Sequence, residues 1–173
     1  MKLVKIGLIN WANIPIAEYE FDDRLNLITG HSAAGKTTIL DAIQTVMTAA
    51  HRGLFQYNPG QDETKQQSKV KESRSLGSYV LGCDDGRYAR PNGAHCHLIA
   101  VFRPDKSNER SESVTAVVSV TARLDRSGNK VTAKEDGDFY AVIKGHELNL
   151  NQFLETVNGR DSVVPPERIR EHF

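Results

Sequence analysis

The sequence predicts an α/β fold in which an antiparallel layer of strands precedes a strand–loop–helix unit. Residues 2–10 alternate loosely between apolar and polar side chains, residues 17–21 alternate strictly, and residues 25–29 (LNLIT) form a short β-prone run. A glycine-containing loop, Gly30 to Thr37 (GHSAAGKT), follows directly. Apolar residues then recur with the period of one helix face, at Ile39, Ala42, Ile43, Val46, Met47 and Ala50.

The loop matches G-x-x-x-x-G-K-[ST], the phosphate-binding loop of nucleoside triphosphatases. Gly30 and Gly35 allow successive backbone N–H groups to turn toward phosphate oxygens, and the helix N-terminus adds partial positive charge. Lys36 would reach the β- and γ-phosphates, and the Thr37 hydroxyl would bind Mg²⁺. An ordinary glycine turn is the alternative, but it explains neither flank. The predicted nucleotide-binding residues are Gly30, His31, Ser32, Ala33, Ala34, Gly35, Lys36, Thr37 and Thr38.

Composition limits which other kinds of protein this chain can be. The 173 residues suffice for one domain, and 22 basic residues balance 22 acidic ones, so net charge favours no nucleic-acid role. Two cysteines provide no disulfide framework, the N-terminus does not resemble a signal peptide, and no apolar run approaches the ~20 residues that span a bilayer. We expect a cytoplasmic protein with no membrane partner.

Further strands are predicted in the second half of the chain. Residues 96–102 (CHLIAVF) are apolar enough for a buried strand, and residues 114–124 are rich in β-branched side chains. A turn is expected at 125–130, with a hairpin partner near Val131 or at 139–143. These elements predict a second, largely antiparallel sheet.

Two short helices are expected near the C-terminal end. Residues 148–157 could form one with Asn151 as its N-cap, and a proline-initiated helix starts at Pro165. The chain stops at Phe173 without a capping residue, so it looks cut within a longer pattern.

The other metal-capable and acidic residues do not form a recognisable site. Cys83, His95, Cys96 and His97 lack the spacing of a zinc site, and in a strand His95 and His97 would share one face with Cys96 on the other, as packing residues. Residues 98–105 do not form a Walker B strand, because an Arg-Pro pair interrupts them.

A basic stretch lies between the two halves, with Lys65, Lys69, Lys71 and Arg74 against one acid, Glu72. It is either a solvated surface loop or a patch that contacts DNA phosphates.

Several segments resemble one family. Leu8-Ile9-Asn10-Trp11, the run Asn26 to Gly30, and the segments Arg74 to Gly82 and Ala89 to His95 are similar to the N-terminal head segment of SMC-like ATPases, and within them to the MukB, MksB and JetC branch of Wadjet plasmid-defence and Mks condensin-like systems. The resemblance covers residues 1 to about 100 well. It departs from the family inside the loop, where Ser32 and Ala33 replace the usual Asn and Gly.

This resemblance implies the N-terminal lobe of an ABC-type ATPase head, with residues 1–173 as a single domain and a coiled-coil arm starting near its end. ATP and Mg²⁺ would bind between two heads, and hydrolysis would release them, driving DNA loop extrusion or entrapment. Implied partners are the C-terminal head lobe, a second head in a homodimer, kleisin-like and MukE-like subunits, DNA and a nuclease subunit. The cellular role would be plasmid defence or chromosome segregation, near the nucleoid.

The same resemblance places no catalytic residue in this chain. The Walker B and signature motifs belong to the C-terminal part of such proteins, so we expect weak or absent hydrolysis by these residues alone. The glutamine that contacts Mg²⁺ in many ABC heads is not assignable from the sequence, and Gln152 is at best a weak candidate for it. Arg74 could approach nucleotide or DNA, or simply face solvent.

Two other functions stay open. A complete small P-loop phosphotransferase, such as a nucleotide or small-molecule kinase, would suit the chain length, although the loop lies late in the sequence. A stand-alone DNA-binding module using residues 65–74 would bind in a salt-dependent way without any effect of nucleotide.

Overall fold

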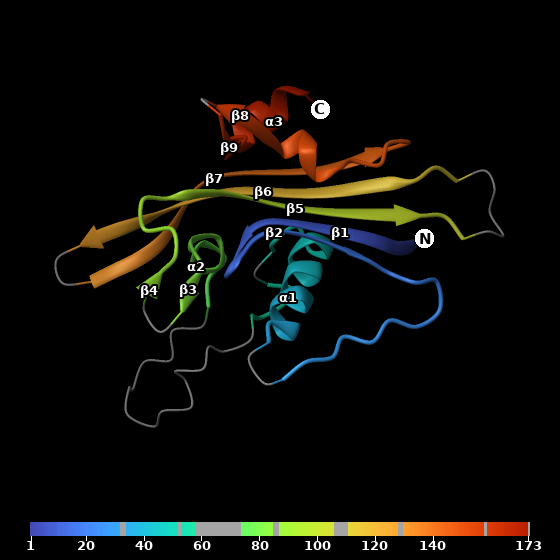
Figure 1. The fold of residues 1–173 in the computed structure, drawn as a ribbon, viewed down its shortest axis with the longest axis horizontal. Helices are drawn as coiled ribbons and strands as arrows, with labels where there is room; N and C mark the ends of the chain where they lie inside the picture. Colours follow the sequence, from blue (N-terminus) through green and yellow to red (C-terminus); the bar gives the residue numbers. More distant parts are fainter. Residues whose placement is uncertain are drawn as a thin grey trace.

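The computed structural model describes residues 1–31, 34–51, 53–57, 74–84, 87–105, 111–127, 130–157 and 159–172. Its centre is one five-stranded sheet in the order β2-β1-β5-β6-β7, and every neighbouring pair is antiparallel (Figure 1). The strands of this sheet are β1 (Lys2–Trp11), β2 (Ile14–Glu20), β5 (Ala94–Arg103), β6 (Val114–Ser127) and β7 (Lys130–Lys144).

The predicted second sheet is wrong, because β6 and β7 extend the same sheet as β1 and β2. The strand β5 joins the two pairs: its side chains are buried on both faces along most of its length, so it takes the central position. The two alternatives for the hairpin partner, Val131 and residues 139–143, both lie in the continuous strand β7.

At the sheet edge, β2 begins earlier than predicted and includes Pro15. Proline lacks the N–H that a ladder needs, but an edge strand tolerates it.

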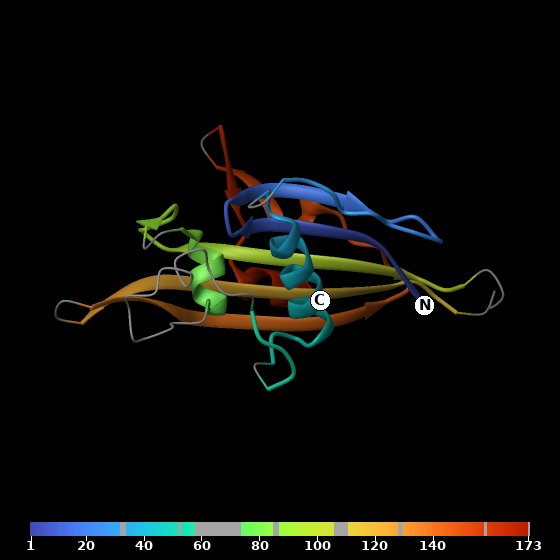
Figure 2. The ribbon, with the colours of Figure 1, turned by 90° about the horizontal axis from the view of Figure 1, so that it is seen from below.

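Separate layers cover the two faces of the sheet. The helices α1 (Lys36–Met47) and α2 (Leu76–Leu81) lie on the lower face, where Figure 2 shows α1 crossing the strands. On the upper face of Figure 1 lie the 3₁₀ turn η2 (Leu150–Phe153), the strands β8 (Leu154–Val157) and β9 (Arg160–Val163), and α3 (Pro166–His172). A two-stranded ribbon of β3 (Cys83–Asp84) and β4 (Arg87–Tyr88) follows α2.

Residues 25–29 are not a strand, which corrects the strand–loop–helix prediction. Leu25 and Leu27 are each 81% exposed. A β-prone run becomes a strand only when a neighbour pairs with it, and no strand among the described residues does so here.

The C-terminal unit also differs in detail from the prediction. Residues 148–157 do not form one helix: Asn149, not Asn151, caps the turn η2, and the chain then enters β8. The side chain of Gln152 accepts a hydrogen bond from the Asn149 N–H at 2.8 Å and completes a capping box. The proline-initiated helix is present as α3 and begins at Pro166.

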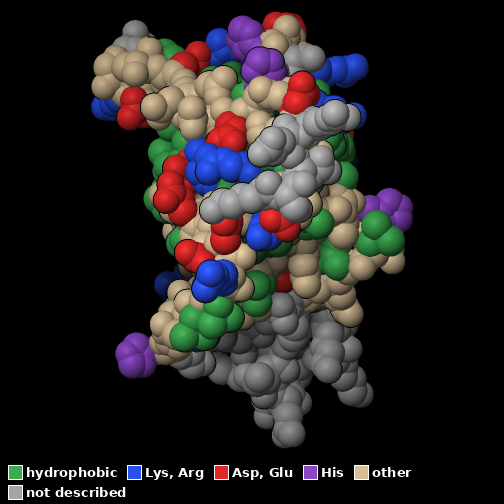
Figure 3. All heavy atoms as spheres, turned by 90° about the vertical axis from the view of Figure 1, so that its right-hand side faces the viewer, with side chains coloured by type: hydrophobic (Ala, Val, Ile, Leu, Met, Phe, Trp, Pro, Cys, Tyr) green, Lys and Arg blue, Asp and Glu red, His purple; other side chains and the backbone are tan. Residues whose placement is uncertain are grey.

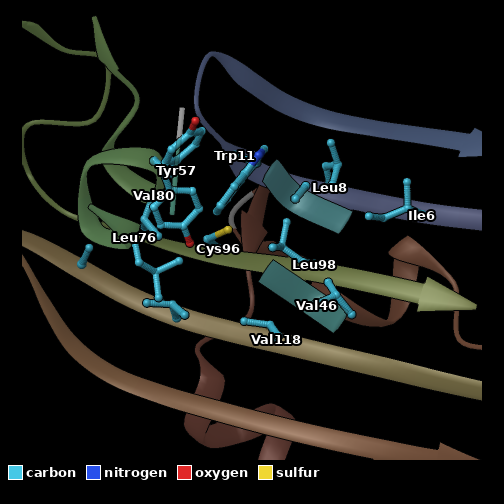
Figure 4. Packing of buried hydrophobic residues seen from close by; sticks show 14 of the residues in the cluster. Ile6, Leu8, Trp11, Val46, Tyr57, Leu76, Val80, Cys96, Leu98 and Val118 are labelled. Carbon is cyan, nitrogen blue, oxygen red and sulfur yellow. The ribbon is translucent and has the colours of Figure 1, made fainter. Parts of the chain in front are cut away.

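Two hydrophobic clusters fill the space between the layers. The lower cluster joins α1 and α2 to the sheet through Leu8, Trp11, Val46, Val80 and Leu98, which converge in Figure 4. The upper cluster joins η2 and α3 to the opposite face through Ile9, Ile99, Val117, Phe153 and Ile169. In the part of the chain that the structure describes, no helix is long and apolar enough to cross a membrane.

Candidate nucleotide-binding site

The phosphate loop enters α1 through a glycine in the left-handed conformation. Gly35 is the N-cap of α1 with φ of 83°, a conformation that an L side chain adopts only with strain. The first backbone hydrogen bond of the helix runs from the Ile39 N–H to the Gly35 carbonyl, so the preceding N–H groups have no acceptor within the helix. Ser32 and Ala33, which belong to the predicted binding set, lie outside the described residues.

Lys36 folds back over the loop. Its Nζ donates to the carbonyl oxygens of Gly30 and His31, each at 2.7 Å. The ammonium group is therefore held above the backbone that leads into the helix. Thr37 follows with an exposed side chain, and Thr38 is half-buried.

This end of α1 suits an anion. The helix N-terminus carries partial positive charge, the Lys36 ammonium lies beside it, and the first turn contains no acidic residue. A triphosphate and its Mg²⁺ fit that set of donors, with Thr37 as the hydroxyl nearest the helix start. Within the described residues, no three His, Cys, Asp or Glu side chains cluster to hold a metal ion by themselves.

A polar stripe on α1 faces the protein interior, which the sequence pattern did not indicate. Asp41 and Thr45 are fully buried, whereas Met47, predicted to lie on the buried face, is 63% exposed. The apolar residues Ala42 and Val46 are buried as predicted. The helix is thus rotated so that two polar side chains share its inner face.

Three aromatic residues form hydrogen bonds with α1. The indole N–H of Trp11 donates to the Thr38 carbonyl at 2.8 Å. The Tyr79 hydroxyl donates to the Asp41 carboxylate. The Tyr57 hydroxyl lies 3.0 Å from Thr45 Oγ1, and in Figure 4 Tyr57 lies beside Trp11. We call Trp11, Tyr57 and Tyr79 the aromatic wall.

Arg74 belongs to the same network. Its Nη1 donates to the Tyr79 hydroxyl at 3.3 Å, and its guanidinium carbon lies 5.4 Å from the centre of that ring. The residue is half-buried, so it is not the freely solvated cation that one alternative expected. Lys65, Lys69 and Lys71, the other members of the predicted basic patch, lie outside the described residues.

Arg90 fastens the wall to the sheet, a role that its sequence position did not suggest. Its Nε donates to the Val80 carbonyl at 2.8 Å, and its Nη2 donates to the carbonyl of Ala12 in the β1–β2 turn. Burial lowers the pKa of Arg90 from its ordinary value. In the sequence, Arg90 is marked by its place in the segment from Ala89 to His95 that resembles the SMC-like family.

The other residues that the sequence suggested as metal or nucleotide ligands lie away from the phosphate loop. Gln152 is on the opposite face of the sheet from Lys36, within the η2 cap, so it does not adjoin the phosphate loop. His97 and Cys96 point to opposite faces and are buried, as expected of packing residues: the His97 ring bonds to Ser119 at 2.7 Å, and Cys96 joins the lower cluster.

The described surface has no dominant charge on the side that Figure 3 shows, where Lys and Arg side chains are interspersed with Asp and Glu. That mixture agrees with the zero net charge of the chain.

Comparison with known proteins supports the loop assignment. A family model described as the P-loop containing region of AAA domain matches residues 3–63 and confirms the predicted P-loop fold. The DNA replication and repair protein RecF of Oceanobacillus iheyensis is 29% identical over 109 residues, which are 59% of this chain and 29% of that protein. The chain therefore spans less than a third of this curated relative. The family model supports a P-loop region in this chain, RecF is a protein that the chain resembles, and neither similarity extends to the MukB, MksB and JetC branch.

Proposed function

We propose that this chain is the ATP-binding lobe of an SMC-like ATPase head that acts on DNA. The observation that carries the proposal is the geometry at the start of α1. There the Lys36 ammonium lies beside first-turn N–H groups that have no acceptor within the helix, at a loop that turns through Gly35 behind an antiparallel β-layer. RecF, the DNA replication and repair protein that the chain resembles, supports a role connected with DNA.

In this proposal the residues of the chain hold the nucleotide and do not hydrolyse it. Lys36 exchanges its two carbonyl contacts for the β- and γ-phosphates, and the first-turn N–H groups of α1 bind the same oxygens. Bound Mg²⁺ would neutralise phosphate charge, with Thr37 as its protein ligand. The Walker B Asp that binds Mg²⁺ and the Glu that polarises the attacking water would come from a C-terminal lobe, and the signature serine from a second head.

The exposed run at residues 25–29 supports the proposal that a C-terminal lobe packs against this chain. It is β-prone, it leads directly into the phosphate loop, and Leu25 and Leu27 stand largely in solvent. A strand from the C-terminal lobe would pair with this run and bury both leucines.

The finer assignment to the MukB, MksB and JetC branch rests on the segments from Arg74 to Gly82 and from Ala89 to His95. Both segments build or fasten the wall behind α1. On this assignment the partners are kleisin-like and MukE-like subunits and, in a defence system, a nuclease. The cellular role is then plasmid defence or chromosome segregation at the nucleoid.

Calorimetric titration of the 173-residue chain with ATP and Mg²⁺ tests the proposal. We expect binding by the wild type and a loss of at least about 100-fold in Lys36→Ala, because charge-assisted hydrogen bonds contribute roughly 1.5–3 kcal/mol each. Lys144→Ala, which removes an exposed lysine at the end of β7, serves as the control and should bind as the wild type does.

Two results would contradict the proposal. Equal ATP affinity in the wild type and Lys36→Ala would exclude the loop as the binding site. Rapid Lys36-dependent transfer of phosphate to a nucleotide or small-molecule acceptor would identify a complete phosphotransferase instead.

A further inference from the structure

We infer that the aromatic wall, Trp11, Tyr57 and Tyr79, positions the phosphate-binding helix and thereby tunes nucleotide affinity, although none of its rings lies in the phosphate loop. The inference rests on the proposed function, because it assigns positioning residues to that same site. It concerns how α1 is held, and so where Lys36 and Thr37 meet a phosphate.

The contacts follow one line along the helix. They fall on Thr38, Asp41 and Thr45, spaced as i, i+3 and i+7, which places them on a single face. The first of them is on the residue directly after Thr37. A helix held at three points along one face can neither rotate about its axis nor slide without breaking a buried hydrogen bond.

The direction of each hydrogen bond is determined by the partners. Thr45 Oγ1 donates to the Asp41 carbonyl at 2.6 Å, so the Tyr57 hydroxyl must donate to Thr45. Tyr79 accepts from Arg74 and donates to Asp41. Burial raises the pKa of both tyrosines, and for Tyr79 the hydrogen bond to Asp41 raises it further, so both remain donors at neutral pH.

The wall itself is held by the sheet. Trp11 and Tyr79 stack with ring centres 4.4 Å apart, and Tyr57 packs against Tyr79 at 4.8 Å. The Ala12 N–H donates to the Tyr79 carbonyl at 2.8 Å, which ties α2 to the β1–β2 turn. Gly82 permits this close approach, because a Cβ there would lie 2.6 Å from the Ala12 carbonyl oxygen.

The wall therefore transmits the position of the β-layer to the nucleotide helix. Loss of one donor leaves its partner, the Thr38 carbonyl, the Asp41 carboxylate or the Thr45 hydroxyl, less well satisfied, and α1 gains freedom to shift at its N-terminal end. A binding site that is no longer held in its binding geometry loses affinity even when every phosphate contact can still form.

Tyr79→Phe tests the inference with little change in shape. Calorimetric titration with ATP and Mg²⁺ should show roughly tenfold weaker binding than the wild type. Trp11→Phe, which keeps a stacking ring but removes the N–H, should act in the same direction, and it provides a second variant if Tyr79→Phe folds poorly. The matched control is Ser119→Ala, which removes a buried hydrogen bond to His97 on the other face of the sheet and should leave ATP affinity unchanged.

Fluorescence offers an independent readout, because Trp11 is the single tryptophan of the chain. Its indole contacts α1 one residue beyond Thr37, so ATP should change the emission of the wild type and change it less in Tyr79→Phe.

The outcomes separate the two proposals. Unchanged ATP affinity in both Tyr79→Phe and Trp11→Phe would overturn the positioning role while leaving the ATP site intact. An equal loss in Ser119→Ala would also overturn it, by showing that general destabilisation is the cause. Equal binding by the wild type and Lys36→Ala would refute the proposed function and this inference with it.

Discussion

Polar side chains are buried on both faces of the sheet, but their hydrogen-bond partners differ between the two faces. On the lower face, Asp41 and Thr45 belong to the helix that carries the phosphate loop, and side chains of the aromatic wall bond to them. On the upper face the buried polar residues His97, Thr115 and Ser119 belong to strands. They satisfy backbone groups of the segments that cross the sheet, such as the carbonyls of Val164 and His146.

This difference separates a positioning function from a structural one. Irregular segments over a sheet need partners for their backbone groups, so the upper contacts follow from the fold. The lower contacts satisfy the polar side chains Asp41 and Thr45. An apolar helix face would need no such hydrogen bonds. The lower face should therefore couple stability to nucleotide binding, and the upper face should contribute stability alone.

The largest expected effect comes from the centre of the upper face. Phe153 is fully buried in the cluster that holds η2 and α3, and Phe153→Ala should lower the free energy of unfolding by about 3–5 kcal/mol. Denaturant titration measures this loss. The milder Phe153→Leu preserves more volume and keeps the comparison measurable if the alanine variant does not fold.

ATP affinity of the folded Phe153→Leu protein should equal that of the wild type, because the upper cluster does not contact α1. A marked loss of affinity would mean that the two faces are not independent.

Acid should act on the upper face through His97. Its Nε2–H donates to the Val164 carbonyl, and its Nδ1 lies 2.7 Å from the Ser119 hydroxyl, which can donate to the neutral ring. Burial lowers the pKa of His97 from 6.5 to about 4. The unfolded chain therefore binds a proton first, and stability is lost as the pH falls from 6.5 toward 4, by about 3 kcal/mol.

Urea unfolding across that pH range, in the wild type and in His97→Leu, measures this contribution as the difference between the two curves. Parallel curves would contradict it.

Alkali should act on the lower face instead. The pKa values of Tyr57 and Tyr79 are raised, mainly by burial, so these hydroxyls stay protonated in the folded protein at pH values where the unfolded chain ionises. Stability is then lost as the pH rises above 10.

The sequence predicted the elements of the fold better than their assembly. Periodicity located β1 and α1, and an apolar run and a β-branched composition located β5 and β6, because each element buries a long apolar face. It could not show that β5 unites one sheet, since strand pairing depends on contacts between residues far apart in the chain. The predicted helix at 148–157 was wrong for a local reason. Asn149 and Gln152 form a capping box that starts a 3₁₀ turn, so the cap lies two residues before the expected Asn151.

The site was predictable only where a motif marks it. The order of Gly30, Gly35, Lys36 and Thr37 is a chemical signature that reads directly from the chain. Trp11, Tyr57 and Tyr79 carry no such signature, because an aromatic residue in a sequence does not reveal which polar group its donor will meet. The burial of Asp41 could not be predicted either, since a carboxylate on a helix is ordinarily solvated.

The smallest expected effect concerns the run at residues 25–29, which packs into neither cluster. Leu25 and Leu27 are mostly in solvent, so the double substitution Leu25→Asn and Leu27→Asn should change the free energy of unfolding by no more than about 0.5 kcal/mol. Leu98→Ala in β5, where the leucine is fully buried, is the matched comparison and should cost about 2–5 kcal/mol. A loss in the double variant close to that of Leu98→Ala would mean that the run is buried within the fold of this chain. A stability near that of the wild type would leave both leucines available to a strand from another lobe.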